Sequence, residues 1–161
     1  MPEARVALPG TAPPELPPGA QPLGPVDPAE PIEVSLLVRP RTPLDELEQR
    51  LEQGAPPLSR EAFAARFGAD PAAVDAVERF AAAHGLHVVQ SDAARRTIVL
   101  GGTAQQLSDA FGVALQRFQA ADGSVFRAQS GALSVSAANA ALSPLVEAVL
   151  GLDTRPQAQP R

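Results

Sequence analysis

The stretch LSREAFAARFGADPAAVDAVERFAAAHGLHVV, residues 58–89, decides the fold. It predicts two helices followed by a strand. Asp70 is a typical helix N-cap residue, Pro71 suits the first helical turn, and Gly85 suits the left-handed residue that ends a helix. In the second helix apolar residues recur at spacings of three and four, with one more beside them, so one stripe faces a core. The stripe consists of Val74, Val77, Phe80, Ala81 and His84. The stretch itself predicts a globular core without catalytic apparatus.

The 161-residue chain divides by its proline content. Most of the 18 prolines lie in the first 57 residues and the last few, whereas the middle contains the Phe, Val and Leu that a core needs. We expect one compact domain at 32–152, because two would not fit this length. Residues 1–31 are expected to form an extended arm, either disordered or lying on a partner, since proline is excluded from helix and sheet interiors. Residues 153–161 are expected to be a linker.

Composition excludes several classes of partner. The net charge is −5 and all 13 basic residues are Arg, which argues against nucleic acid, because phosphate binding needs clustered positive charge. The chain has no Cys, so disulfides and thiolate metal sites are excluded. No apolar run approaches the roughly 20 residues of a membrane span, so no membrane partner is expected. The first residues, MPEARVALPG, do not resemble a signal peptide.

Hydrophobic periodicity predicts an α+β fold. The expected strands are 32–39, 86–91, 96–101, 113–118, 125–128 and 145–150, with a short strand or bridge at 133–136. The expected helices run from Thr42 to Gly54 (stripe Leu44, Leu47, Leu51), Ser59 to Gly68, Pro71 to His84 and Thr103 to Gly112, with a helical turn at 137–142 stopped by Pro144. This order is the ferredoxin-like βαββαβ pattern with an extra hairpin and extended arms at both ends. We expect an antiparallel sheet with its helices on one face.

The second face of this sheet is unusually apolar. A sheet covered on one side only should alternate apolar and polar residues, yet these strands carry apolar residues at both parities. Contiguous exposed apolar surface marks partner sites, so we predict that this face docks a partner. Its predicted residues are Leu37, His87, Val89, Thr97 and Val99. The alternative is that the arm or the 113–128 hairpin covers it.

The residues give little support for catalysis. His84 and His87 are the only histidines, and Gly85 places one at a helix end and the other in a strand, so their spacing does not predict a metal or acid–base pair. Asp92, Asp109 and Asp122 fall at turns or on a helix surface, where acidic residues are common. No G-x-S-x-G motif, phosphate loop or zinc spacing is present.

Several stretches resemble the activation domain that precedes the catalytic domain in the sedolisin family of serine-carboxyl peptidases, the kumamolisin type in particular. They are LGPVDPAEPIEVSLLVRPR (23–41), residues 58–86, RRTIVLGGTAQQLSDAFGVALQRF (95–118), Phe126-Arg127 and VLGLDTRPQAQP (149–160). The AFGV motif and GLDTRPQA are the most specific. Phe126 stands where the family pattern has Tyr, and SVSAANA (134–140) lacks the usual proline.

This resemblance implies a zymogen propeptide, not an enzyme. It implies a domain that acts as an intramolecular chaperone and inhibitor of its peptidase until autocatalytic removal in acid. The partner would be the cognate catalytic domain, in cis or as a cleaved complex. The family's Ser, Glu and Asp triad and its calcium site belong to that domain, so no cofactor is expected in this chain. The resemblance also implies secretion.

The same resemblance implies that the linker passes through the active-site cleft. Its residues are Asp153, Thr154, Arg155, Pro156, Gln157, Ala158, Gln159, Pro160 and Arg161. Candidate interface arginines are Arg39, Arg66, Arg95, Arg96 and Arg127, whose carboxylate partners would lose charge as pH falls toward ~4. Two other hypotheses stay open. One is a stand-alone ferredoxin-like regulatory or dimerisation module, and the other is a small enzyme that uses His87 with an aspartate.

Overall fold

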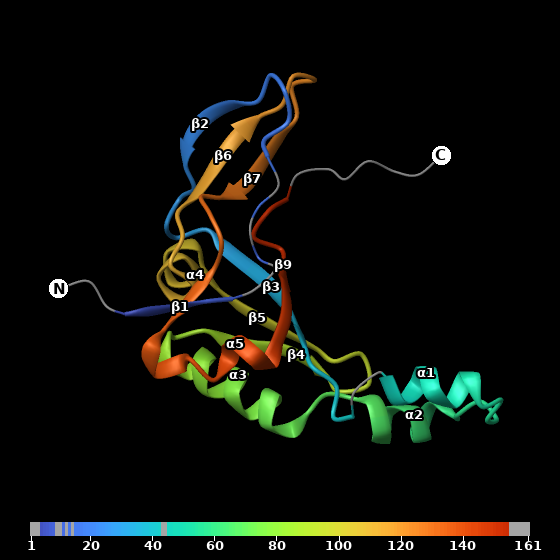
Figure 1. Ribbon diagram of the computed structural model, residues 1–161. Coiled ribbons are helices and arrows are strands. Elements are labelled where there is room, and N and C mark those ends of the chain that lie inside the picture. Colours follow the sequence, from blue (N-terminus) through green and yellow to red (C-terminus); the bar gives the residue numbers. More distant parts are fainter. Residues whose placement is uncertain (1–3, 9–10, 12, 14, 43–44, 155–161) are drawn as a thin grey trace.

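A four-stranded antiparallel sheet forms the centre of the molecule (Figure 1). The computed structural model describes residues 4–8, 11, 13, 15–42 and 45–154. The strands are β3 (Pro31–Val38), β4 (His87–Asp92), β5 (Thr97–Thr103) and β9 (Val146–Leu150), in the order β4-β5-β3-β9. This order is that of a ferredoxin-like βαββαβ sheet, in which the first and third strands are central. The predicted fold class is confirmed.

Two helices cover one face of this sheet. They are α3 (Pro71–Ala83) and α4 (Ala104–Phe111), whose rings Phe80 and Phe111 meet with centroids 5.2 Å apart. The predicted caps are confirmed: the Asp70 carboxylate accepts from the Ala72 amide, and Thr103 forms a capping box with Gln106. The sheet turns the alternate residues of β3 and β5 toward these helices, where they are fully buried. These residues are Val34, Leu36, Val38, Ile98 and Leu100.

The N-terminal arm pairs with distant parts of the chain. β1 (Arg5–Ala7) forms a two-stranded ladder with β8 (Ser134–Ser136). β2 (Gln21–Pro25) joins the predicted hairpin, β6 (Leu115–Gln119) and β7 (Val125–Gln129), in a second sheet of order β2-β6-β7. Both arm strands lie at sheet edges, which is where proline is tolerated. Where it is described, the arm is therefore extended, as expected, and its strands pair within this same chain.

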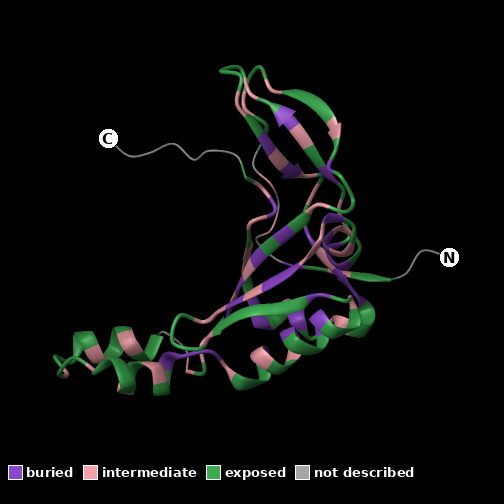
Figure 2. Ribbon diagram, turned by 180° about the vertical axis from the view of Figure 1, so that it is seen from behind, coloured by how far each residue is buried: buried purple, intermediate pink, exposed green. Residues whose placement is uncertain are grey.

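Two short helices extend away from the sheets (Figure 1). They are α1 (Asp45–Glu52) and α2 (Arg60–Phe67), and the burial colouring shows them mostly exposed (Figure 2). The predicted apolar stripe of α1 does not join the core: Leu51 is 72% exposed and the described helix has no buried residue. Leu44, the first residue of the predicted stripe, and the neighbouring Pro43 lie outside the described residues.

Several predicted strand boundaries differ by one or two residues, and the predicted helix stop at Pro144 is wrong. A 3₁₀ turn, η1 (Ala137–Asn139), is followed by the short helix α5 (Leu142–Leu145), so Pro144 lies inside a helical turn instead of stopping one. Proline is tolerated there because the first helical turn needs no amide hydrogen at that position. The final strand consequently begins at Val146, one residue later than predicted.

Candidate functional site

The second face of the four-stranded sheet is open. We use "open face" for the surface formed by Leu37, Thr97, Val99, His87 and Val89 together with their neighbours of the same parity. Leu37 pairs with Thr97, and Ser35 pairs with Val99, so these side chains lie side by side on the face away from α3 and α4. All five predicted residues are partly or fully exposed, and Val89 is 48% exposed. Neither the described part of the arm nor the β6–β7 hairpin buries them. Their role in docking stays a prediction.

A hollow of about 460 Å³ lies at one side of the open face. His87 pairs with Gly101, and a Cβ at Gly101 would come within 2.7 Å of the imidazole Nε2 and 3.1 Å of Val89. Glycine therefore lets the imidazole lie flat against β5. Glu33 and Gln106 also line the hollow, and Glu33 is the only carboxylate among its lining residues. The described lining does not include the aspartate that the enzyme hypothesis requires.

Sequence reasoning missed the contribution of the last strand to this face. Ala148 pairs with Leu37, and Leu150, which is 62% exposed, pairs with Ser35. Because residues opposite one another in register point to the same face, both belong to the open face. The sequence VEAVL does not alternate, because a register shift between β3 and β9 leaves Glu147 without a paired residue on β3. The face to which each residue belongs becomes clear only from the pairing of β9 with β3.

Three of the candidate arginines lie at one end of the sheet. Arg39 donates to Asp70 at 2.9 Å, and Arg96 donates to Glu147 and to the Val38 carbonyl, each at 3.0 Å. Arg95 lies 3.7 Å from Asp92 and is 84% exposed. Surface pairs of this kind contribute little to folding, so at least Arg95 remains available to a partner. Their role at an interface stays a prediction.

The pKa of the Asp70 carboxyl is lowered in the folded protein. The hydrogen bond from the Ala72 amide is the largest effect and lowers the pKa of this carboxyl below its ordinary value of 3.8. Burial opposes this shift, and the hydrogen bond and charge of Arg39 lower the pKa further. Asp70 therefore stays ionised in moderate acid. It links the start of α3 to the end of β3.

The other two candidate arginines lie elsewhere. Arg66 on α2 is 3.7 Å from Glu46 on α1 and belongs to the extended helix pair. Arg127 on β7 has a side chain only 14% exposed and donates to Glu30 on the N-terminal side of β3. Burial lowers the pKa of Arg127, and the neighbouring charge of Arg117 lowers it further, whereas Asp153 raises it.

The C-terminal segment leaves the sheet next to Arg127. Leu152 is buried, and Asp153 is half-buried. Thr154 is exposed and exchanges hydrogen bonds with the Arg127 backbone. The remainder of the predicted linker, residues 155–161, lies outside the described residues.

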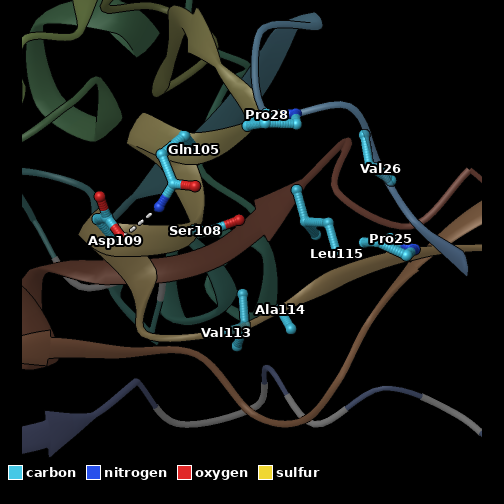
Figure 3. A pocket seen from close by; sticks show the side chains of 10 residues that line it. Pro25, Val26, Pro28, Gln105, Ser108, Asp109, Val113, Ala114 and Leu115 are labelled. Atoms are coloured by element: carbon cyan, nitrogen blue, oxygen red, sulfur yellow. Dashed lines mark hydrogen bonds between the residues drawn. The ribbon is translucent and has the colours of Figure 1, made fainter.

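A second concavity, of about 420 Å³, lies between α4 and the segments 25–28 and 113–115 (Figure 3). Figure 3 shows its polar side chains on α4, where Gln105 donates to Asp109 at 2.8 Å, and Ser108 lies nearby. The rest of the lining is apolar and comes from Pro25, Val26, Pro28, Ala104, Val113, Ala114 and Leu115. One internally bonded carboxylate does not form a catalytic group.

The described residues contain no group of three or more His, Cys, Asp or Glu that could hold a metal ion. Across the same described part of the chain, no helix is long and apolar enough to cross a membrane. The features described above form a surface, with the open sheet face in the middle, charged pairs at one end and an anchored C-terminal segment at the other.

An α+β domain with an open sheet face and a C-terminal segment held beside it is suited to binding another protein. The family model described as "Pro-kumamolisin, activation domain" matches residues 18–155, and the chain belongs to this family. It is 41% identical over 144 residues to kumamolisin from Bacillus sp. (strain MN-32), a match that covers 85% of this chain. The chain spans 25% of the length of that relative. The sequence resemblance is thus confirmed at the level of the family.

Proposed function

We propose that this chain is the propeptide of a secreted, acid-acting serine-carboxyl peptidase of the kumamolisin type. It assists the folding of the catalytic domain, inhibits that domain, and is removed by autocatalytic cleavage at low pH. The calcium that the family implies would bind to the catalytic domain. The open face is the observation that carries the proposal. Exposed apolar surface of this kind marks a site for a partner. In a family of activation domains, the expected partner is the catalytic domain.

Inhibition requires two contacts. The open face supplies apolar area near its centre, where binding energy concentrates when water is excluded. The segment after β9 supplies an extended chain for the cleft. Docking of the face raises the effective concentration of that segment, so a segment that binds weakly by itself still occupies the cleft.

Acid weakens such a complex through its carboxylates. Pairs such as Arg95 with Asp92 and Arg96 with Glu147 lie at one end of the sheet, where catalytic-domain carboxylates would also meet arginines. Carboxylates lose their charge as pH falls toward ~4, and their pairs with arginine are then lost. Inhibition is therefore expected to be stronger at pH 7 than at pH 4.

Two adjacent valines provide a matched test. Val89 and Val88 lie on the same edge strand and are 48% and 42% exposed. Val89 lies on the open face beside His87, whereas Val88 pairs with Leu100, which points toward the helices. The inhibition constant of each Asp variant is measured against the mature peptidase of the same precursor. Val89→Asp should weaken inhibition about 30-fold, the cost of about 2 kcal/mol for placing a charge in an apolar interface. Val88→Asp should change it less than about threefold.

If the unmodified chain does not inhibit the peptidase at pH 7 or at pH 4, the proposal is wrong. Equal effects of the two variants would refute the assignment of the open face while leaving the propeptide function intact. Light scattering of the chain alone separates the proposal from a dimerisation module. A concentration-independent monomer agrees with the propeptide, and a stable dimer that buries the open face contradicts it.

A further inference from the structure

The Arg127 guanidinium holds the beginning of the C-terminal segment. Its Nη2 donates to the Gly151 carbonyl at 2.7 Å and its Nε donates to the Leu152 carbonyl at 3.1 Å. Its Nη1 donates to the Glu30 carboxylate at 3.3 Å. One side chain therefore joins β7, the residue before β3 and two consecutive carbonyls after β9.

The backbone of the same residue forms a second attachment. The Arg127 amide donates to the Thr154 hydroxyl at 2.7 Å, and the Thr154 amide donates to the Arg127 carbonyl at 2.8 Å. β7 is an edge strand, so its outer amide and carbonyl groups are free to accept an added segment. Arg127 thus makes four hydrogen bonds to the segment 151–154: its guanidinium bonds the carbonyls of Gly151 and Leu152, and its backbone bonds Thr154 twice.

Gly151 makes this geometry possible. Its φ is +111°, and a Cβ at this position would lie 2.8 Å from the Glu33 carbonyl oxygen. Only glycine adopts such a backbone conformation at little cost while approaching another strand so closely. The chain therefore turns directly after β9 and continues beside β3 toward Glu30 and Arg127.

We propose that Arg127 is a positioning residue, which fixes the point and direction at which the C-terminal segment leaves the domain. This role deepens the proposed function, on which its consequence for inhibition rests. A segment that starts from a fixed anchor samples fewer directions, so its effective concentration at the cleft is higher. The anchor itself is a property of this chain alone and is tested without the peptidase.

The identity of the side chain matters, because the three bonds diverge from a single planar group. Lysine retains the charge but concentrates its donors on one atom, so it cannot reach two carbonyls and a carboxylate in this geometry. Arg117 on β6 is the matched control. It contacts the same Glu30 carboxylate, but among the described residues its hydrogen bonds do not include 151–154.

The test is amide hydrogen exchange at Thr154, followed by NMR in the full chain under native conditions, with thermal unfolding measured in parallel. Arg127→Lys and Arg127→Gln should each accelerate exchange at Thr154 by about tenfold or more, because hydrogen bonds from a charged donor to the preceding carbonyls are lost. Arg117→Gln should change this rate less than about twofold. Thr154→Val removes only the hydroxyl acceptor of an exposed residue, and it should accelerate exchange to an intermediate extent.

Unchanged exchange in a folded Arg127→Lys variant overturns the proposal, as does equal acceleration by Arg117→Gln. Should the Arg127 variants fail to fold, the Thr154→Val result decides: unchanged exchange overturns the anchor, and faster exchange supports it. Inhibition by Arg127→Lys is then compared with the parent chain. Weaker inhibition with accelerated exchange supports the link to the cleft. Accelerated exchange combined with an unmodified chain that does not inhibit counts against the proposed function and leaves the anchor standing.

Discussion

Replacement of Asp70 by Ala should destabilise the domain by about 1.5 kcal/mol at pH 7. The carboxylate accepts from the Ala72 amide at 3.0 Å, and loss of such an N-cap typically costs about 1 kcal/mol. Its second contact, with Arg39 at 2.9 Å, involves an arginine side chain that is 45% exposed, so it adds only about 0.5 kcal/mol. For a chain of this length the total corresponds to a fall in Tm of about 3–6 °C.

The stabilisation that Asp70 provides should decrease in acid. Because the pKa of Asp70 is lowered in the folded protein, the stabilisation is fully present above the ordinary value of 3.8 and is lost as pH falls through the lowered pKa. The difference in Tm between the parent and Asp70→Ala should therefore shrink below pH 3.8. Asp70→Asn keeps the cap and should lose only the contribution of Arg39. A difference in Tm that is constant from pH 7 to pH 2, or absent at pH 7, would refute this reasoning.

Three further substitutions test the core, a cap and the extended helices. Phe80→Ala removes a fully buried ring that packs on Phe111, and should lower the free energy of unfolding in urea by about 3–5 kcal/mol; a loss below about 1 kcal/mol contradicts the assigned core. Gln106→Ala removes the acceptor of the Thr103 amide and should cost about 1 kcal/mol, seen as a lower Tm; an unchanged Tm counts against the capping box. Leu51→Glu should change stability by less than about 0.5 kcal/mol because this side chain is 72% exposed, and a larger loss would place α1 in the core.

Local signals predicted the central elements well. The caps at Asp70 and Thr103, the turn at Gly123 and the apolar stripe of α3 depend on residues within one or two turns, and the structure confirms them. The two parities of β3 and β5 also predicted which residues face away from the helices. These features need no knowledge of distant partners, and so the sequence is sufficient.

Features that depend on distant pairing were missed. Prolines in 21–25 suggested an arm that is disordered or lies on a partner, yet this segment pairs with β6 at the edge of a sheet. The stripe with Leu47 and Leu51 has the period of a core helix, but α1 extends away from the sheets. Arg127 was predicted as an interface residue without its contacts to the carbonyls at 151 and 152, because backbone acceptors leave no signal in a sequence.

The position of β9 in the sheet bears on how the domain is made. β3 lies between β5 and β9, so one of its edges stays unpaired until β9, the last of the four strands of this sheet, has been synthesised. Pairings between such distant segments close slowly, and an unpaired apolar edge can recruit other chains in the meantime. The risk of aggregation for this domain therefore lies in the interval before residues 146–150 arrive. In a chain truncated within β9, this edge of β3 would stay unpaired.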